Sequence, residues 1–251
     1  MKITLRGLLK LYLKFIDTLK ANTEVDYTRF IYWLKNYIGL KKSERTFKST
    51  FLPKYQEGQI IFTDFGCGIG HEFSYPHYAV ILNCHDKKNN SLITVVPLTS
   101  KKEKHNKLRS HEYELATPIQ VLLGNKALND FDLNKPEYHE LRDDIVKMAQ
   151  SKLSKDAFDK KYAELVQQGV QTIINNNADI MSLRQKMKEG SIVECNQIRT
   201  ISKARIISPK KSSDPLYNVR VTEGDLSLIR LKLMRQFIFK NIDSLTTESV
   251  K

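Results

Sequence analysis

The stretch IIFTDFGCGIGHEFSYPHYAVILN, residues 60–83, consists of two runs typical of β-strands with a glycine-rich segment between them. The runs at 59–65 and 78–83 are rich in Ile, Val and Tyr, which favour strands. In nucleotide-binding enzymes, a glycine-rich segment such as DFGCGIG leads a strand directly into a helix. Here only seven residues, 71–77, lie between Gly70 and the second run, whereas parallel strands need a connection of about a dozen residues. We therefore expect an antiparallel pair and no bound cofactor.

The segments around this pair change between helical and strand-like patterns. Apolar residues recur at helical spacing in 4–40, 134–189 and 225–242. Strand-like runs occur at 92–98 and within 191–222. A polar cluster at 86–90 predicts a hairpin that joins 78–83 to 92–98. The sequence therefore predicts an α+β fold.

The composition excludes several classes of protein. Hydrophobic residues make up 41% of the 251, which favours a folded globular chain over a disordered one. The three cysteines are far apart, which indicates a reducing compartment, and Cys67 with His71 or Cys84 with His85 lacks the usual spacing of zinc ligands. Lysines interrupt the apolar N-terminus, and no stretch reaches the ~20 apolar residues of a membrane span. We expect a cytoplasmic protein with no metal and no membrane partner.

The net charge of +13 is concentrated in particular segments. Residues 1–50 contain eleven Lys or Arg against four Asp or Glu, and 195–213 contain five against none. Residues 101–110 contain five against one, whereas 136–189 balance nine with nine. Localised positive charge indicates a polyanionic partner such as nucleic acid. The alternative is a lysine-rich surface that only contacts solvent.

Three blocks of the sequence carry a resemblance to a known family. They are EGQIIFTDFGCGIGHEFSYPHYAVILN (57–83), SLITVVPLTS (91–100) and SIVECNQIRTISKARI (191–206). In this order, and followed by a C-terminal helix, they resemble the PemK/MazF family of mRNA endoribonuclease toxins. The most specific part is QIRTI at 197–201, and Gly70-His71-Glu72 stands where the family has Gly-Ser-Glu.

The resemblance implies a small SH3-like β-barrel, often dimeric, that cleaves single-stranded RNA without a metal or other cofactor. It also implies a possible antitoxin partner. On this basis, residues 54–242 form the barrel domain, interrupted by a helical insertion at about 117–189, and residues 1–50 form an N-terminal helical extension. The attacking group in such a reaction is the 2′-hydroxyl of the RNA, so the protein has only to move protons and stabilise charge.

The resemblance also implies the site residues. The family usually has a catalytic Arg followed by Pro at the start of the second strand, where this chain has Pro76-His77. We predict that His77 takes over proton transfer, because imidazole has an ordinary pKa of about 6.5. Thr99 matches the family's catalytic Thr, whose hydroxyl can bond a phosphoryl oxygen. The predicted substrate-binding residues are Arg199, Gln197, His71, Glu72, Tyr75 and Lys101.

Structural roles remain open for several of these residues. Arg199 can bind phosphate through its planar fork or form a structural salt bridge. Glu72 can orient His77, bond a base edge or simply cap its loop. For the whole protein, the missing Arg leaves open a catalytically silent relative that binds nucleic acid or an antitoxin.

Overall fold

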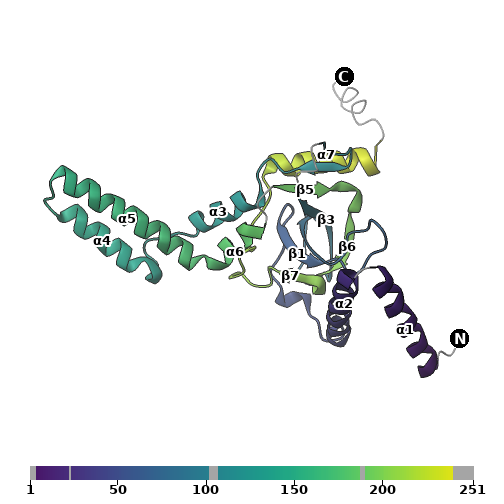
Figure 1. Cartoon of the computed structure of the whole chain (residues 1–251). Helices are drawn as coiled ribbons and strands as arrows, with labels where there is room; N and C mark the ends of the chain where they lie inside the picture. Colours follow the sequence, from purple (N-terminus) through teal and green to yellow (C-terminus); the bar gives the residue numbers. More distant parts are fainter. Residues whose placement is uncertain (1–3, 23, 102–106, 187–189, 240–251) are drawn as a thin grey trace, which may run out of the picture.

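The computed structural model describes residues 4–22, 24–101, 107–186 and 190–239, and it contains a seven-stranded sheet with helices around it (Figure 1). The order of the strands is β4-β5-β3-β2-β1-β7, and β6 also pairs with β3. The strands are β1 (Ile60–Asp64), β2 (Pro76–Ile81), β3 (Leu92–Ser100), β4 (Glu112–Glu114), β5 (Ser191–Glu194), β6 (Arg199–Ser202) and β7 (Ile206–Ser208). Each of these pairings is antiparallel, including that of β1 with β2 and that of β2 with β3, as the sequence predicts.

The sheet is open. Its outer strands are β4 and β7, which do not pair with each other in the described part of the chain. β3 is the longest strand and pairs with β2 along one edge. Its other edge pairs with β6 through 92–95 and with β5 through 98–100. The α+β class is therefore confirmed, whereas strand pairing does not close the sheet into the predicted barrel.

The central strands are buried on both faces, which explains their nearly continuous apolar sequence. Alternate residues of β1, β2 and β3 point to opposite sides. One side contributes to a core cluster with α3 (Ile119–Asn129), α6 (Ala178–Lys186) and α7 (Glu223–Phe237). The other side packs against a second cluster that includes Leu52, Tyr55, Ile201 and Ile206. The register of the three strands is therefore fixed from both faces.

The C-terminal helix α7 is shorter than the sequence indicates. Its N-cap is Thr222, whose side chain accepts a hydrogen bond from the main-chain N–H of Asp225 at 3.1 Å. The helix ends at Phe237, and residues 240–242 of the predicted helix lie outside the described residues. The strand-like segment before α7 also differs from expectation, since its pairing is a single bridge between Gln59 and Arg220.

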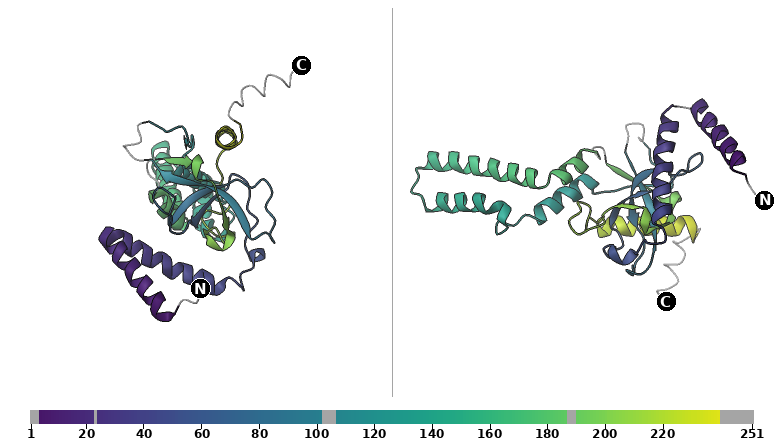
Figure 2. Two further views of the ribbon diagram at one scale, coloured as in Figure 1. Left: turned by 90° about the vertical axis from the view of Figure 1, so that its right-hand side faces the viewer. Right: turned by 90° about the horizontal axis from the view of Figure 1, so that it is seen from below.

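A helical insertion separates β4 from β5. It contains α3, α4 (His139–Gln150), α5 (Lys155–Asn176) and α6, and the α4–α5 hairpin projects away from the sheet (Figures 1 and 2). Its two ends meet at the sheet edge, where Glu114 pairs with Ile192 and the N–H of Leu115 donates to the oxygen of Ser191 at 2.9 Å. The insertion thus occupies the place of a turn between neighbouring strands.

The N-terminal residues form a helical hairpin of α1 (Leu5–Asn22) and α2 (Glu24–Ser43) (Figure 2). The two helices contact each other through Phe15 and Phe30, whose ring centroids are 4.6 Å apart. After α2, the chain joins the second core cluster through Phe47 and Leu52. None of the described helices is long and apolar enough to cross a membrane.

A buried ion pair fixes the β2–β3 hairpin to the segment after β6. Lys203 Nζ lies 2.6 Å from Asp86 Oδ1, and both side chains are almost completely buried. The other carboxylate oxygen of Asp86 accepts the main-chain N–H of Tyr55 at 3.1 Å. Lys203 is therefore an internal residue, although the sequence places it in a positively charged segment expected to face a polyanion.

Replacing Lys203 with Met is expected to lower the free energy of unfolding by about 3–5 kcal/mol, because Asp86 would be left buried without its cation. Urea unfolding monitored by circular dichroism measures this change. Lys41→Met, at an exposed pair with Glu44, is the control and should leave stability unchanged. The double variant Lys203→Met/Asp86→Asn should recover part of the loss; purely additive losses would contradict the coupling.

A chain that begins at Arg45 is expected to remain folded, because it retains Phe47, Leu52 and both core clusters and loses only the α1–α2 hairpin. Thermal unfolding should stay cooperative. The helical circular-dichroism signal should decrease by the contribution of the residues in α1 and α2. An insoluble product, or one without a cooperative transition, would show that the hairpin is part of the core.

Candidate functional site

The glycine-rich segment 65–75 forms a closed loop between β1 and β2. Its ends join through two hydrogen bonds, from Phe65 N–H to the oxygen of Tyr75 at 3.1 Å and from Tyr75 N–H to the oxygen of Gly66 at 2.6 Å. Inside the loop, Gly68 N–H donates to Ser74 Oγ at 3.0 Å. The N–H groups of Phe65, Gly68 and Tyr75, which a phosphate-binding loop could turn to its ligand, are therefore used within this loop.

Gly66 is required where the loop approaches other elements. Its φ is +87°, a conformation that favours glycine. A Cβ at this position would lie 3.2 Å from Arg205 Nη1 and 3.6 Å from Trp33 Nε1. The absence of a side chain thus lets α2 and the segment after β6 come close to the loop.

Two residues from the C-terminal half hold this loop. Arg199 Nη1 donates to the main-chain oxygen of Phe65 at 3.0 Å and to that of Phe73 at 3.5 Å. Gln197 Nε2 donates to the oxygen of His71 at 3.2 Å, and its Oε1 accepts from Phe73 N–H at 3.5 Å. These contacts position the loop, and the binding of substrate by Arg199 and Gln197 stays a prediction.

Glu72 has a similar role within the loop. Its Oε2 accepts the N–H of Ile69 at 3.2 Å, and the same oxygen lies 3.9 Å from Arg199 Nη2. The structure thus contains the loop cap that the sequence left open as an alternative. His71 is an exposed residue of the same loop, and Tyr75 adopts a φ of +67° at its end.

His77 of β2 and Thr99 of β3 lie on neighbouring strands and line the same hollow. The pairing of β2 with β3 includes Ala79 with Pro97, two residues from His77 and two from Thr99. Both residues are partly buried and both line a hollow with a volume of about 290 Å³. The remaining residues of this hollow are Phe62, Pro76, Tyr78, Leu98 and Ser100. The structure therefore brings together the two predicted catalytic residues.

The surroundings of His77 favour its neutral form. Burial lowers the pKa of His77 below its ordinary value, and the positive charge of Arg29 acts in the same direction. Hydrogen bonding with the main chain of Leu98 and Ser74 opposes this shift without cancelling it. The ring of Phe73 packs edge-on against the imidazole at 4.8 Å between centroids. At neutral pH the imidazole is thus available as a proton acceptor.

His77 also lines a larger groove between the loop and the N-terminal hairpin. This groove has a volume of about 1000 Å³. The hairpin contributes Phe15, Leu19, Arg29, Phe30 and Trp33, and the other wall is residues 67–75 of the loop. His71, Glu72 and Tyr75 are part of that wall. The sequence indicated a positive N-terminal extension but did not single out Arg29 or Trp33, because their approach to the loop depends on how α2 packs.

Lys101 is separate from this groove. Its ammonium donates to both carboxylate oxygens of Glu114, at 2.7 and 2.9 Å, and so joins the end of β3 to β4. The predicted role of Lys101 in binding substrate therefore competes with a structural ion pair. Lys101 thus pairs its charge with a carboxylate, whereas Arg199 donates to main-chain oxygens, which are neutral.

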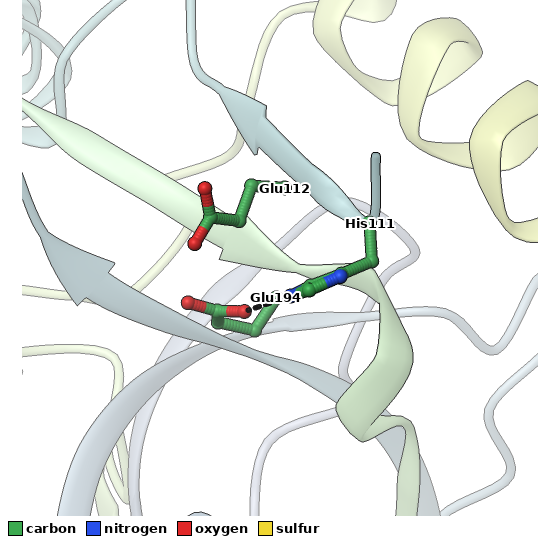
Figure 3. A group of neighbouring side chains, drawn as sticks. All are labelled: His111, Glu112 and Glu194. Atoms are coloured by element: carbon green, nitrogen blue, oxygen red, sulfur yellow. Dashed lines mark ion pairs between the residues drawn. The ribbon is translucent and has the colours of Figure 1, made fainter. Parts of the chain in front are cut away.

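A separate group of titratable side chains lies where β4 pairs with β5 (Figure 3). His111 points toward Glu194, with 3.6 Å between Nε2 and Oε2. Glu112 is buried and accepts the main-chain N–H of Arg109 at 2.7 Å. One possible ligand atom from each of the three residues lies within 4.8 Å of the others. The cluster of His111, Glu112 and Glu194 is thus held by contacts within the protein. The sequence did not indicate that these three residues lie together.

Comparison with known proteins identifies the family. Residues 56–174 match the family described as PemK-like, MazF-like toxin of type II toxin-antitoxin system. The match includes His77 and Thr99 and continues through α3 and α4 into α5, beyond the blocks that carried the resemblance. No curated protein matches the chain. Over residues 56–174, the chain thus matches the family of PemK-like, MazF-like toxins of type II toxin-antitoxin systems.

Proposed function

We propose that this protein is an endoribonuclease toxin that cleaves single-stranded mRNA by attack of the RNA's own 2′-hydroxyl, without a metal ion. The observation that carries the proposal is that His77 and Thr99 line one hollow, within the segment that matches the toxin family. The fold of the proposed enzyme is an open relative of the SH3-like barrel. A cognate antitoxin protein is the proposed partner, and a homodimer the proposed assembly.

In the proposed reaction, His77 accepts the proton of the 2′-hydroxyl. The oxygen then attacks the neighbouring phosphorus and forms a 2′,3′-cyclic phosphate, while the bond to the 5′-oxygen breaks. The departing 5′-oxygen takes up a proton, and the imidazolium formed in the first transfer is one source of it. Thr99 donates a hydrogen bond from its hydroxyl to a phosphoryl oxygen, where negative charge develops.

A catalytically silent relative that binds nucleic acid or an antitoxin is the second candidate. The internal contacts of Arg199 and Lys101 favour it, because these two predicted phosphate ligands already have partners. Binding of single-stranded RNA without the appearance of cleavage products distinguishes this candidate from the enzyme.

Purified protein is expected to cut single-stranded RNA in the presence of EDTA and to leave 2′,3′-cyclic phosphate ends. His77→Ala and Thr99→Ala should each slow cleavage by about 10²-fold or more, the usual scale for proton transfer and charge stabilisation. Gel analysis of a labelled RNA, with mass spectrometry of the ends, measures both effects.

His85→Ala and Thr94→Ala change the same residue types outside the hollow and should cut at the normal rate. Normal cutting by the His77 and Thr99 variants would place the site elsewhere, and rescue of an EDTA-treated protein by Mg²⁺ would contradict the mechanism.

The pH dependence of cleavage should follow the lowered pKa of His77. A proton acceptor works only when it is neutral, so kcat/KM should rise with pH through a pKa below about 6.5 and stay level above it. Single-turnover rates measured from mildly acidic to neutral pH give this profile. A rate that instead falls as pH rises through this range would assign His77 the role of a proton donor.

A further inference from the structure

The hollow around His77 and Thr99 needs a permanent positive charge to hold the phosphate of the substrate. Two cations predicted for this purpose are engaged elsewhere. Arg199 donates to main-chain oxygens of the glycine-rich loop, and Lys101 bonds both carboxylate oxygens of Glu114. A residue with fewer internal contacts is better placed to supply the charge.

Arg29 of α2 is the residue in position to do so. Arg29 and His77 line the same groove, and Arg29 is exposed. Among the described residues of the groove wall, it is the one with a permanent positive charge. Among the residues whose side chains the structure describes, which leaves out 22–26, no hydrogen bond or ion pair joins it to a partner. Its charge also helps to lower the pKa of His77, so the two side chains are within electrostatic reach.

The one carboxylate in the described wall of the groove is Glu72, and its charge is partly balanced. It accepts the N–H of Ile69 and lies 3.9 Å from the guanidinium of Arg199. The guanidinium of Arg29 therefore keeps its attraction for an incoming phosphate.

The hairpin also supplies aromatic surface to the groove. Phe15 is 41% exposed, and Trp33 and Tyr75 line the same space. Unpaired bases stack on aromatic side chains of this kind. The indole Nε1 of Trp33 is buried and has no hydrogen-bond partner among the described residues. A buried donor without a partner is uncommon in proteins, and an acceptor on a ligand would satisfy it if α2 moved away from Gly66.

We propose that the groove between the α1–α2 hairpin and the 65–75 loop is a binding subsite for single-stranded nucleic acid, in which Arg29 binds a phosphate and the aromatic wall stacks an unpaired base. The inference rests on the proposed function, because the ligand is the substrate of that reaction. It assigns to the N-terminal extension a direct part in the site.

The sole tryptophan of the chain, Trp33, reports on this groove. The full-length protein is titrated with a short mixed-sequence single-stranded DNA oligonucleotide in EDTA, because DNA lacks the 2′-hydroxyl and is not cleaved. Saturable quenching of the Trp33 fluorescence is expected. Arg29→Ala should weaken the affinity by about 10-fold or more and reduce the salt slope by about 0.7, the value for one phosphate contact on a single strand. Arg29→Lys, which keeps the charge but not the fork, should have an intermediate affinity.

Arg45→Ala is the matched control, because Arg45 is an exposed arginine after α2 that does not line the groove. Equal affinities of the Arg29→Ala and Arg45→Ala proteins would overturn the inference. Binding detected by anisotropy of a labelled oligonucleotide without a change in Trp33 fluorescence would also overturn it, as would the absence of binding. Circular dichroism verifies that the variants are folded.

A second measurement does not depend on nucleic acid. Removing the charge of Arg29 should raise the pKa of His77 toward its ordinary value, as followed by NMR titration of the imidazole, whereas Arg45→Ala should not. An unchanged pKa in Arg29→Ala would contradict the position assigned to Arg29. Cleavage of RNA by the wild-type protein is scored separately. If binding depends on Arg29 but RNA is not cleaved, the proposed enzymatic activity is wrong and the subsite is supported. If RNA is cleaved but Arg29→Ala does not weaken binding, the activity is supported and the subsite is wrong.

Discussion

Burial of β1, β2 and β3 on both faces is the constraint on which the rest of the structure depends. A shift of one residue in any of these strands would exchange the side chains of the two core clusters, so neither face tolerates it. The same packing fixes β2 and β3 side by side, and His77 and Thr99 of these strands line one hollow although neither residue is part of a core cluster. The alignment of the candidate site is thus a consequence of packing elsewhere in the sheet.

Positive charge in this chain serves two purposes that its sequence does not separate. Lys203 is paired with Asp86 in the interior, and Arg199 holds a loop through its main-chain oxygens. Arg29 and Lys210, by contrast, are exposed. Burial depends on which segments meet in three dimensions. The number of basic residues in a segment therefore overestimates the positive charge that the segment presents to a partner. The exposed basic residues of the N-terminal hairpin contribute more to the surface charge than their number alone indicates.

Local sequence was sufficient for much of the fold. Strand-like runs around 59–65 and 78–83, with too short a connection for a crossover, correctly indicate the antiparallel pair. The sequence could not indicate that Gly66 admits α2, since the contact joins segments with no shared pattern. It also suggested a strand before α7, where the pairing is a single bridge at Arg220. The family resemblance was enough to propose His77 and Thr99 as candidate catalytic residues, whereas the residues around them could not be predicted because they depend on tertiary packing.

The helical insertion has a consequence for how the chain folds. Without it, β4 and β5 would form a local hairpin, an element that closes within microseconds. With it, the pairing of Glu114 with Ile192 becomes a long-range contact. Closing a longer loop adds only about 0.6 kcal/mol for each doubling of length, so the equilibrium cost is small. The effect on the folding rate is larger, because residues that are far apart in the sequence take longer to come into contact. Packing of α3 against α6 at the base of the insertion shortens that search, and we expect these two helices to meet before the outer strand joins the sheet.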